Sequence, residues 1–356
     1  MEPACRIDKQ KQKDTPNRGD RVKQKSAQQG LKRRQRAEIY ALNKVMTELE
    51  QQQFEAFCKQ IQPQAESGSA RTMSLVKDAK TERVSIDRLR TLDRFDARED
   101  DVLLVSYPKS GTHWLAEILK NLYHCRSPTH PTGQVTLTQP LEFQDPSKLG
   151  ELKNLPSPRL IPTHLPKNMV PRELQTKQCK VIYVIRNPKD TAVSMFHYYQ
   201  QNPHLPKVDK WATFLDMFLK GEVVYGSWVD HLLSWDRSDN GNTLFVYYES
   251  LKKDLPKCVQ EISEFLGVKV TEDQVREISK KSSFREMKAR VEKEKERSDA
   301  NHIVCALTSD RKLIFRKGAV GDWKNHFTQD QNSQFEALLG EKINSSELAS
   351  SVEYEC

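Results

Sequence analysis

The sequence predicts an α/β fold in which a single domain, residues 81–356, has a central parallel sheet flanked by helices. Short apolar runs alternate along this region with longer segments of helical periodicity, which is typical of a parallel sheet covered on both faces. The length of the region is normal for one such domain. The expected strands are 102–106, 159–163, 181–185 and 243–247, and the expected helices are 112–124, 190–201, 211–220, 228–236, 255–266, 272–281 and 329–339.

The first expected strand and helix enclose a turn that has the features of an anion site. Residues 102–120 read VLLVSYPKSGTHWLAEILK. Gly111 lets the backbone approach an anion, the helix offers unpaired N–H groups, and Lys109 adds a point charge. The turn is not a Walker A loop, because Lys109 precedes the only glycine. An ordinary strand-to-helix turn with a surface lysine is the alternative.

Two later segments add cations to this picture. Residues 315–328, FRKGAVGDWKNHFT, place Arg316 and Lys317 before two glycines, which suits a flap that closes over a phosphate. A solvated basic turn is the alternative reading. In residues 180–200, an apolar strand ends in Arg186, and Ser194 lies on the second turn of the helix that follows. Open α/β sheets bind ligands at the carboxyl ends of their strands, where Arg186 is expected.

YPKSGTHW, RNPKDTAVS and RKGAVGDWKNHFT, in this order and spacing, resemble the cytosolic sulfotransferase family, which uses 3′-phosphoadenylyl sulfate (PAPS). PRLIPTHLP (158–166), FVYYESLKKD (245–254) and SSFREMK (282–288) fit the same pattern, so the resemblance covers about Leu92 to Leu339. Within the family the chain is most similar to the 6B branch. The resemblance implies the sulfotransferase fold with a P-loop-like PAPS-binding core, PAPS as co-substrate, and no metal.

The resemblance also implies roles for individual residues. A 5′-phosphosulfate loop would comprise Lys109, Ser110, Gly111, Thr112 and His113, and a 3′-phosphate site would comprise Arg186, Ser194, Arg316, Lys317 and Gly318. Trp114, Tyr248 and Phe284 would surround the adenine, and Ser282, Met287, Ile314 and Phe315 would complete the co-substrate site. His164 matches the catalytic base, and Lys109 and Ser194 complete the catalytic set. An imidazole suits proton removal from an acceptor near pH 7.

The implied reaction is transfer of a sulfo group to a hydroxyl or amine of a small molecule such as a phenol, an iodothyronine or a steroid. Loops around 139–150, 198–208 and 300–312 are expected to form the acceptor pocket. A P-loop-type kinase is a rival function, but a Walker A sequence and a Mg²⁺-binding acidic strand end are missing. The other rival is a nucleotide-binding protein with little catalysis, which the departures below keep open.

Three departures from the family pattern stand out. Pro162 occupies the place where many members have a lysine, two residues before the histidine, and His113 replaces a common threonine. The family's dimer motif, K-x-x-x-T-V-x-x-x-E, is incomplete, because Lys324 and Thr328 remain but Gln329 and Ser333 replace its valine and glutamate. The motif therefore gives a homodimer only partial support.

Net charge separates the N-terminus from the rest of the chain. Residues 1–40 contain 12 Lys and Arg against 5 Asp and Glu, whereas the remaining residues contain 45 against 44. Residues 1–35 are expected to be a disordered basic tail, and residues 36–80 an amphipathic helix and a linker. The basic cluster at 32–36 could be a nuclear signal or contact nucleic acid, although a solvated tail is the favoured reading.

The remaining composition indicates a cytoplasmic enzyme. The seven cysteines are scattered and form no C-x-x-C pair, so neither zinc nor a disulfide framework is expected. The N-terminus lacks the apolar core of a signal peptide, and nowhere do 18 apolar residues run together. We therefore expect no membrane contact, and the resemblance implies a small-molecule acceptor as the main partner.

Overall fold

The computed structural model describes residues 86–126, 135–202, 205–236, 241–293 and 316–355. The chain divides into two units, residues 1–66 and 67–356, and all described residues belong to the second. The expected basic tail and nearly all of the expected helix and linker, residues 1–80, lie outside the described residues, so their boundaries stay predictions.

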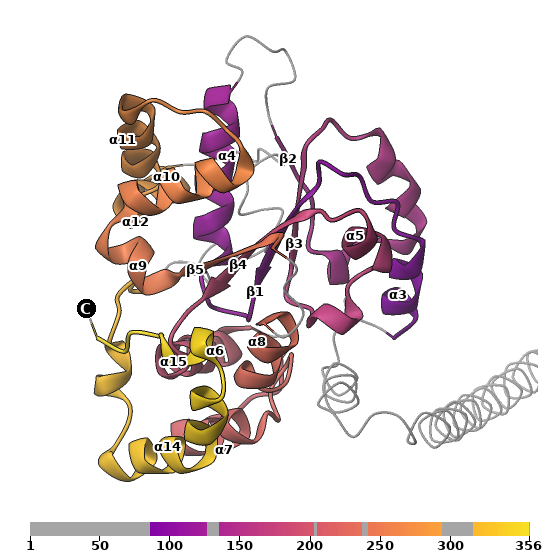
Figure 1. The fold of residues 1–356 in the computed structure, drawn as a ribbon. Helices are drawn as coiled ribbons and strands as arrows, with labels where there is room; N and C mark the ends of the chain where they lie inside the picture. Colours follow the sequence, from indigo (N-terminus) through magenta and orange to yellow (C-terminus); the bar gives the residue numbers. More distant parts are fainter. Residues whose placement is uncertain (1–85, 127–134, 203–204, 237–240, 294–315, 356) are drawn as a thin grey trace, which may run out of the picture. The chain divides into compact units, whose positions relative to one another are not determined.

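Five parallel strands form the central sheet in the order β2-β3-β1-β4-β5 (Figure 1). They are β1 (Val102–Ser106), β2 (Thr136–Leu137), β3 (Arg159–Thr163), β4 (Lys180–Ile185) and β5 (Thr243–Tyr247). The predicted α/β class and parallel sheet are confirmed. Four strands lie within one residue of their expected positions, because each contains a short, mostly apolar run. The sequence did not indicate β2, whose two residues are too few to show a pattern.

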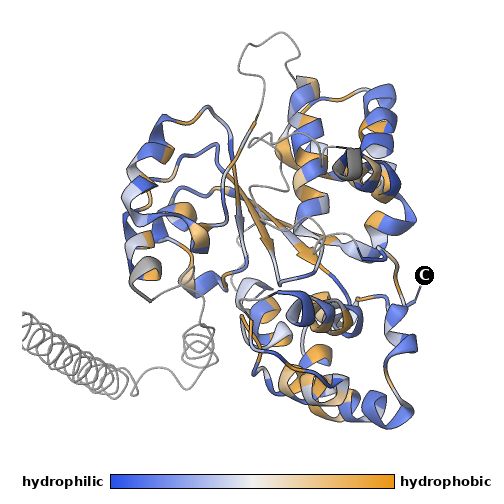
Figure 2. Ribbon diagram, turned by 180° about the vertical axis from the view of Figure 1, so that it is seen from behind, coloured by the Kyte–Doolittle hydropathy of each residue, from blue (hydrophilic) through white to orange (hydrophobic). Residues whose placement is uncertain are grey.

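Alternate side chains of the strands pack into two hydrophobic layers. Val102 and Leu104 of β1 face one layer, whereas Leu103 and Val105 face the other. The first layer is covered by α4 (Thr112–Arg126), α10 (Leu255–Leu266) and α11 (Glu272–Lys281). The second is covered by α6 (Pro188–Gln201), α7 (Trp211–Lys220), α8 (Trp228–Asp236) and α14 (Gln329–Asn344). Figure 2 shows mostly hydrophobic strands between helices that carry many hydrophilic residues.

Further elements complete the fold, and the sequence analysis did not predict them. They are the helices α3 (Ile86–Thr91), α5 (Arg172–Thr176), α9 (Tyr248–Lys253), α12 (Phe284–Lys293) and α15 (Glu347–Ser350), and the 3₁₀ helices η1 (Leu92–Arg94), η2 (Leu141–Phe143), η3 (Pro146–Asn154), η4 (Lys167–Met169) and η7 (Asp322–Asn325).

Two expected helix ends differ from the structure for identifiable reasons. Helix α6 begins at Pro188 rather than 190, because the side chain of Asn187 caps it by accepting a hydrogen bond from the backbone N–H of Asp190 at 2.7 Å. Helix α14 ends at Asn344 rather than 339, because Ile343 continues its buried face beyond Gly340. Helix α4 also extends two residues beyond its expected end.

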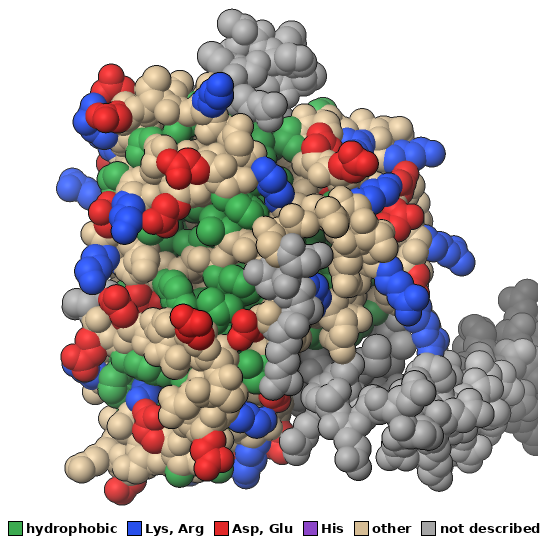
Figure 3. Space-filling model, in the orientation of Figure 1, with side chains coloured by type: hydrophobic (Ala, Val, Ile, Leu, Met, Phe, Trp, Pro, Cys, Tyr) green, Lys and Arg blue, Asp and Glu red, His purple; other side chains and the backbone are tan. Residues whose placement is uncertain are grey.

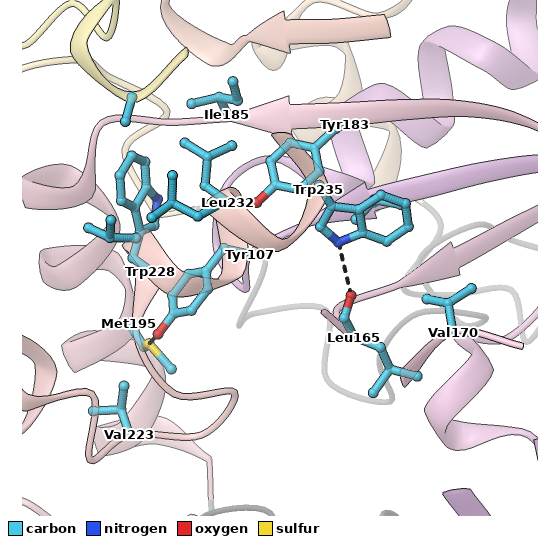
Figure 4. Packing of buried hydrophobic residues seen from close by; sticks show 14 of the residues in the cluster. Tyr107, Leu165, Val170, Tyr183, Ile185, Met195, Val223, Trp228, Leu232 and Trp235 are labelled. Atoms are coloured by element: carbon cyan, nitrogen blue, oxygen red, sulfur yellow. Dashed lines mark hydrogen bonds between the residues drawn. The ribbon is translucent and has the colours of Figure 1, made fainter. Parts of the chain in front are cut away.

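Large side chains of the second layer hold the segments that follow β1 and β3 (Figure 4). The phenol of Tyr107 donates to the carbonyl of Gly226 at 2.7 Å. The indole of Trp235 donates to the carbonyl of Leu165 at 3.3 Å, directly after His164 in the chain. Side chains of the core therefore fix the segments that directly follow β1 and β3.

On the face drawn in Figure 3, Lys and Arg side chains are intermingled with Asp and Glu. Within the part of the chain that the structure describes, no helix has the length and apolar character needed to cross a bilayer. The cysteines in this part, Cys125, Cys179 and Cys258, are free.

Candidate active site

The loops after β1, β3, β4 and β5 meet at the carboxyl edge of the sheet and line an open pocket. Parallel strands bring their carboxyl ends together, which explains why segments far apart in sequence converge here. The expected site residues that line the pocket are Lys109, Gly111, Thr112, His113, Trp114, His164, Arg186, Ser194, Tyr248, Phe284, Met287, Arg316, Lys317 and Gly318.

Of the other four expected site residues, two do not line this pocket and two lie outside the described residues. Ser110 is fully buried in the loop after β1. Ser282 is also buried, and it supports the pocket by accepting hydrogen bonds from Trp114 Nε1 at 2.7 Å and Asn121 Nδ2 at 3.0 Å. Ile314 and Phe315 lie outside the described residues.

The loop between β1 and α4 has a backbone that only particular residues can adopt. Gly111 has a φ of 115°, and a Cβ at this position would lie 2.9 Å from the ring of Tyr248. Lys109 is held at a φ of 69°, in the left-handed region. The hydroxyls of Ser106 and Thr112 lie 2.6 Å apart and tie the helix start to the end of β1.

Arg186, directly after β4, connects this loop to the flap near the C-terminus. Its Nη1 donates to the carbonyl of Lys109 at 3.0 Å, and its Nη2 donates to the carbonyl of Ala319 at 3.3 Å. Its guanidinium lies 4.4 Å from the centre of the Tyr248 ring. The sequence predicted an anion contact at Arg186, and the structure adds that this side chain also joins two walls of the pocket.

A carboxylate that the sequence analysis did not identify holds the two flap cations. Asp322 accepts from Arg316 Nη1 at 2.6 Å and from Lys317 Nζ at 2.7 Å. Although burial favours its neutral form, the hydrogen bonds from Lys317, Asn325 and Arg316 outweigh burial and keep the Asp322 pKa well below its usual range. Both cations are thus held at the pocket by a permanent negative charge.

Asp190 anchors the flap to α6. Its fully buried carboxylate accepts from the backbone N–H groups of Gly321 at 2.8 Å and Trp323 at 2.9 Å. At Gly318, whose φ is 62°, a Cβ would lie 2.4 Å from the ring of Phe284. The flap backbone therefore lies directly on that aromatic ring.

Burial and neighbouring cations change the protonation of two residues in the first loop. Burial, then Arg186 and Arg316, lower the pKa of Lys109 to about 8. Burial, then Lys109 and His164, lower the pKa of His113 to about 3, so its imidazole is neutral near pH 7. A concentration of positive charge in a sheltered place favours binding of a multiply charged anion.

Unsatisfied polar atoms indicate where such an anion would bind. Among the described residues, the buried atoms without a hydrogen-bond partner include Ser110 Oγ, His113 Nε2 and Arg186 Nε. Leaving buried polar atoms unpaired costs free energy. All three belong to residues expected to contact the phosphates of PAPS, so the donor set of this pocket fits that co-substrate.

An aromatic pocket lies beside the cations. The rings of Trp114 and Tyr248 meet edge to face with centroids 5.2 Å apart. Lys252 of α9, which the sequence analysis did not select, lies 5.5 Å from the Trp114 centroid and 5.8 Å from that of Phe284. Flat aromatic faces beside a cation suit a purine base.

His164 follows β3 at the sheet edge. Its Nδ1 lies 2.7 Å from the carbonyl oxygen of Ser106. Because a carbonyl oxygen can only accept, Nδ1 carries the proton and the lone pair is on Nε2. Strands β1 and β3 are adjacent and pair Val105 with Thr163, which brings the next residue of each strand together. The sheet register therefore places the His164 imidazole beside the end of β1 and fixes its orientation.

Pro162, which departs from the family pattern, is tolerated within β3 because the sheet is narrow there. Strand β2 pairs only with Arg159 and Leu160, so β3 has β1 as its single strand partner at Pro162. Proline supplies no cationic side chain at this position.

The remaining wall of the pocket contains residues that the sequence analysis did not select individually: Pro108, Phe143, Met195, Tyr198, Val224, Tyr225 and Lys252. Phe143 and Tyr198 fall in two of the loops expected to form the acceptor pocket. Val224 and Tyr225 come from the turn between α7 and α8, which no motif marked. The third expected acceptor loop, 300–312, lies outside the described residues.

Comparison with known proteins identifies two family matches. The sulfotransferase domain family model matches residues 99–347, and the coiled-coil domain-containing protein 23 model matches residues 3–66. Sulfotransferase 6B1 of Danio rerio is 38% identical over 273 residues, which are 76% of this chain and 86% of that protein.

Solved structures agree with the match to the sulfotransferase domain family. The crystal structure of mouse sulfotransferase SULT7A1 complexed with PAP is 52% identical, has a TM-score of 0.68, and covers 76% of this chain and 94% of its own. Retinol dehydratase in complex with androsterone and the inactive cofactor PAP is 22% identical, with a TM-score of 0.60 over 78% of this chain and 95% of its own, and shows the fold alone.

Proposed function

The chain belongs to the cytosolic sulfotransferase family, and we propose that it transfers the sulfo group of PAPS to a hydroxyl or amine of a small molecule with His164 as general base. Family membership decides against the kinase alternative. It also confirms the resemblance seen in the sequence, including the similarity to the 6B branch.

One observation carries the proposal for this chain. A histidine whose lone pair is fixed on Nε2 lines the same pocket as Lys109, Arg186, Arg316 and Lys317. Bound PAPS supplies the activated sulfo group. The cations would hold an anionic donor in place, and the imidazole lines the same pocket, where an acceptor could meet it. A base and an anion cradle in one pocket suit group transfer from an anionic donor.

His164 would take the proton of the acceptor as the acceptor atom bonds to sulfur. An uncharged hydroxyl is a weak nucleophile, so proton removal during attack lowers the barrier. Lys109 would oppose the negative charge that develops when the bond between sulfur and the bridging oxygen breaks. Ser194, which lines the pocket from α6, would contact the donor.

The acceptor side favours a flat apolar molecule. Phe143, Tyr198 and Tyr225 line this part of the pocket. Aromatic walls with a few polar groups bind ring systems well. We therefore propose phenols, iodothyronines and steroids as the first acceptor classes to compare, with amines as a further class.

The test is transfer of labelled sulfo from PAPS by the purified full chain to this acceptor panel. His164→Ala should lower turnover about 100-fold or more while PAP still binds, because only the base is removed. His124→Ala is the matched control, since His124 is exposed on α4. Undiminished turnover of the His164 variant would remove this residue from the mechanism, and absence of transfer by the parent chain to any acceptor would overturn the proposed activity.

A further inference from the structure

Glu142, in η2, has a fully buried carboxylate that no sequence motif marked. Its Oε2 accepts from the hydroxyl of Thr163 at 2.9 Å. Its Oε1 accepts from the backbone N–H of His164 at 2.9 Å and from the phenol of Tyr225 at 3.0 Å. One side chain thus connects the end of β3, the residue in the base position and the acceptor wall.

Tyr225 transmits this contact to the imidazole. Its ring meets the ring of His164 edge to face, with centroids 5.5 Å apart. Burial first, and then the Glu142 carboxylate, raise the pKa of Tyr225 well above its usual value, so its phenol remains a hydrogen-bond donor. Tyr225 also has a φ of 67°, which is unusual for a residue with a side chain. Its placement is therefore held by its contacts.

His164 is held by contacts to both its ring and its backbone. Ser106 accepts from Nδ1, Tyr225 packs against the ring, and Glu142 binds the backbone N–H. On the other side of the chain, His231 Nε2 donates to the carbonyl of His164 at 2.9 Å. Of these groups, only Glu142 binds both His164 and Tyr225, whose ring packs against the imidazole.

Burying a carboxylate is costly, and its hydrogen bonds must offset the lost hydration. A neutral residue could fill the same space without this cost. Because the carboxylate accepts charge-assisted hydrogen bonds from the base segment and from Tyr225, it fixes their relative position more strongly than a neutral acceptor would.

We propose that Glu142 is a positioning residue that, through Tyr225 and the backbone of His164, aligns the imidazole with the acceptor. This inference rests on the proposed role of His164 as base. Glu142 does not line the pocket, and its hydrogen bonds leave the donor cations untouched. Its loss should therefore reduce turnover without weakening the donor.

The first test separates turnover from donor binding. Glu142→Ala should lower kcat about 100-fold, because a small displacement of a catalytic group is sufficient for such a loss. PAP binding, measured by calorimetry, should stay within about twofold of the parent, since no donor contact changes. Glu142→Gln should recover at least about tenfold of the lost kcat, because its amide oxygen still accepts from His164 and Tyr225.

Tyr225→Phe provides an independent variant in case Glu142→Ala does not fold. It should lower kcat about tenfold, because a hydrogen bond to a charged group is lost. Tyr247→Phe is the matched control, since the phenol of Tyr247 also donates one hydrogen bond of 3.0 Å, to the carbonyl of Leu348. Tyr225→Phe should lose turnover, and Tyr247→Phe should keep it.

The double variant Glu142→Gln/Tyr225→Phe tests the coupling between the two residues. Its kcat should be no lower than the kcat of the less active single variant, because both changes disturb the same interaction. Losses that multiply would overturn the proposal, as would a kcat for Tyr225→Phe within about twofold of the parent.

A spectroscopic readout does not depend on activity. In protein with ¹⁵N-labelled histidine, the Nδ1–H signal of His164, assigned by its loss in His164→Ala, should be protected from exchange by Ser106. Tyr225→Phe should increase its exchange rate, and Tyr247→Phe should not. Unchanged exchange in Tyr225→Phe would overturn the proposal. If His164→Ala instead retains turnover, the proposed base fails, whereas the exchange result still decides whether Glu142 and Tyr225 position the ring.

Discussion

The protonation of Lys109 depends on whether an anionic donor is bound. Burial and the neighbouring Arg186 and Arg316 lower its pKa to about 8, so the donor-free protein holds this proton less tightly than an exposed lysine would. A bound anion has the opposite effect, because it favours the charged form. Binding of PAP and protonation of Lys109 are therefore linked, and each promotes the other.

The affinity for PAP should therefore fall as the pH rises through about 8. Below this pH Lys109 is already charged, and above it binding must also supply a proton. Calorimetry from pH 6.5 to 9.5, a range of about three units around that pKa, should show a break near pH 8 in the parent chain. Lys109→Met should bind more weakly and lose the break. A flat profile in the parent would contradict the predicted role of this lysine.

The lowered pKa of Lys109 also predicts how the free energy of unfolding changes with pH. In the folded state Lys109 binds a proton less tightly than in the unfolded chain, so its contribution is unfavourable below about pH 8 and disappears as the pH rises toward 10.5. Lys109→Met should consequently raise the thermal midpoint of donor-free protein at pH 7, and this gain should shrink at pH 10. A lower midpoint at pH 7 would show that the lysine stabilises the loop instead.

The flap is the element whose sequence explains its structure most directly. Its glycine at 318 combines a left-handed backbone with direct contact to Phe284. Its two cations are held by Asp322, and Asp190 anchors the segment to α6. Such a segment would keep the proposed donor contacts in place before the donor binds, which would reduce the ordering cost of binding.

Gly318→Ala should weaken PAP binding at least about tenfold, because the new Cβ must displace the Phe284 ring or the flap backbone. Gly267→Ala is the matched control, since Gly267 has a φ of 70° but nothing within 4 Å of an added Cβ. Both variants carry left-handed strain, and only Gly318→Ala carries the collision. Equal PAP affinity in the two variants would show that the close approach at the flap does not matter.

How far the elements could be predicted depends on the length of their pattern. The four longer strands and seven helices were predictable because buried runs and helical periodicity extend over several residues. Strand β2 and helices α3, α5, α9 and α15 have six residues or fewer, too few to show a period. Most pocket residues were predictable from contiguous motifs. Glu142 and Tyr225 were not, because they lie 83 positions apart and only the fold joins them.

At the scale of the whole molecule, the sequence has two parts with different relatives. The coiled-coil domain-containing protein 23 model matches residues 3–66 and the sulfotransferase model matches residues 99–347. The chain also divides into units 1–66 and 67–356. All described residues of the pocket belong to the second unit. We infer that the second unit can act without the first.

Deleting residues 1–66 should leave kcat, PAP affinity and the thermal midpoint of the catalytic unit nearly unchanged. The reason is that the described residues that form the pocket and the two hydrophobic layers all belong to residues 67–356. Parallel assays of the full and shortened chains with the same acceptor would check this. Loss of turnover, or a midpoint lower by several degrees, would show instead that the N-terminal segment stabilises the sulfotransferase unit.

Polyanion binding should belong to the first 40 residues. They hold a net charge of +7 of the chain's +8, whereas the rest of the chain is almost neutral. A chain without residues 1–40 should bind heparin much more weakly than the full chain, and the dependence of binding on salt should become shallow, because fewer counterions are released. The control for chain length is a full-length variant in which glutamine replaces Lys32, Arg33, Arg34 and Arg36. Binding that keeps its strength and salt dependence after deletion would locate the polyanion site on the sulfotransferase unit, where the phosphate-binding pocket would be the first place to examine.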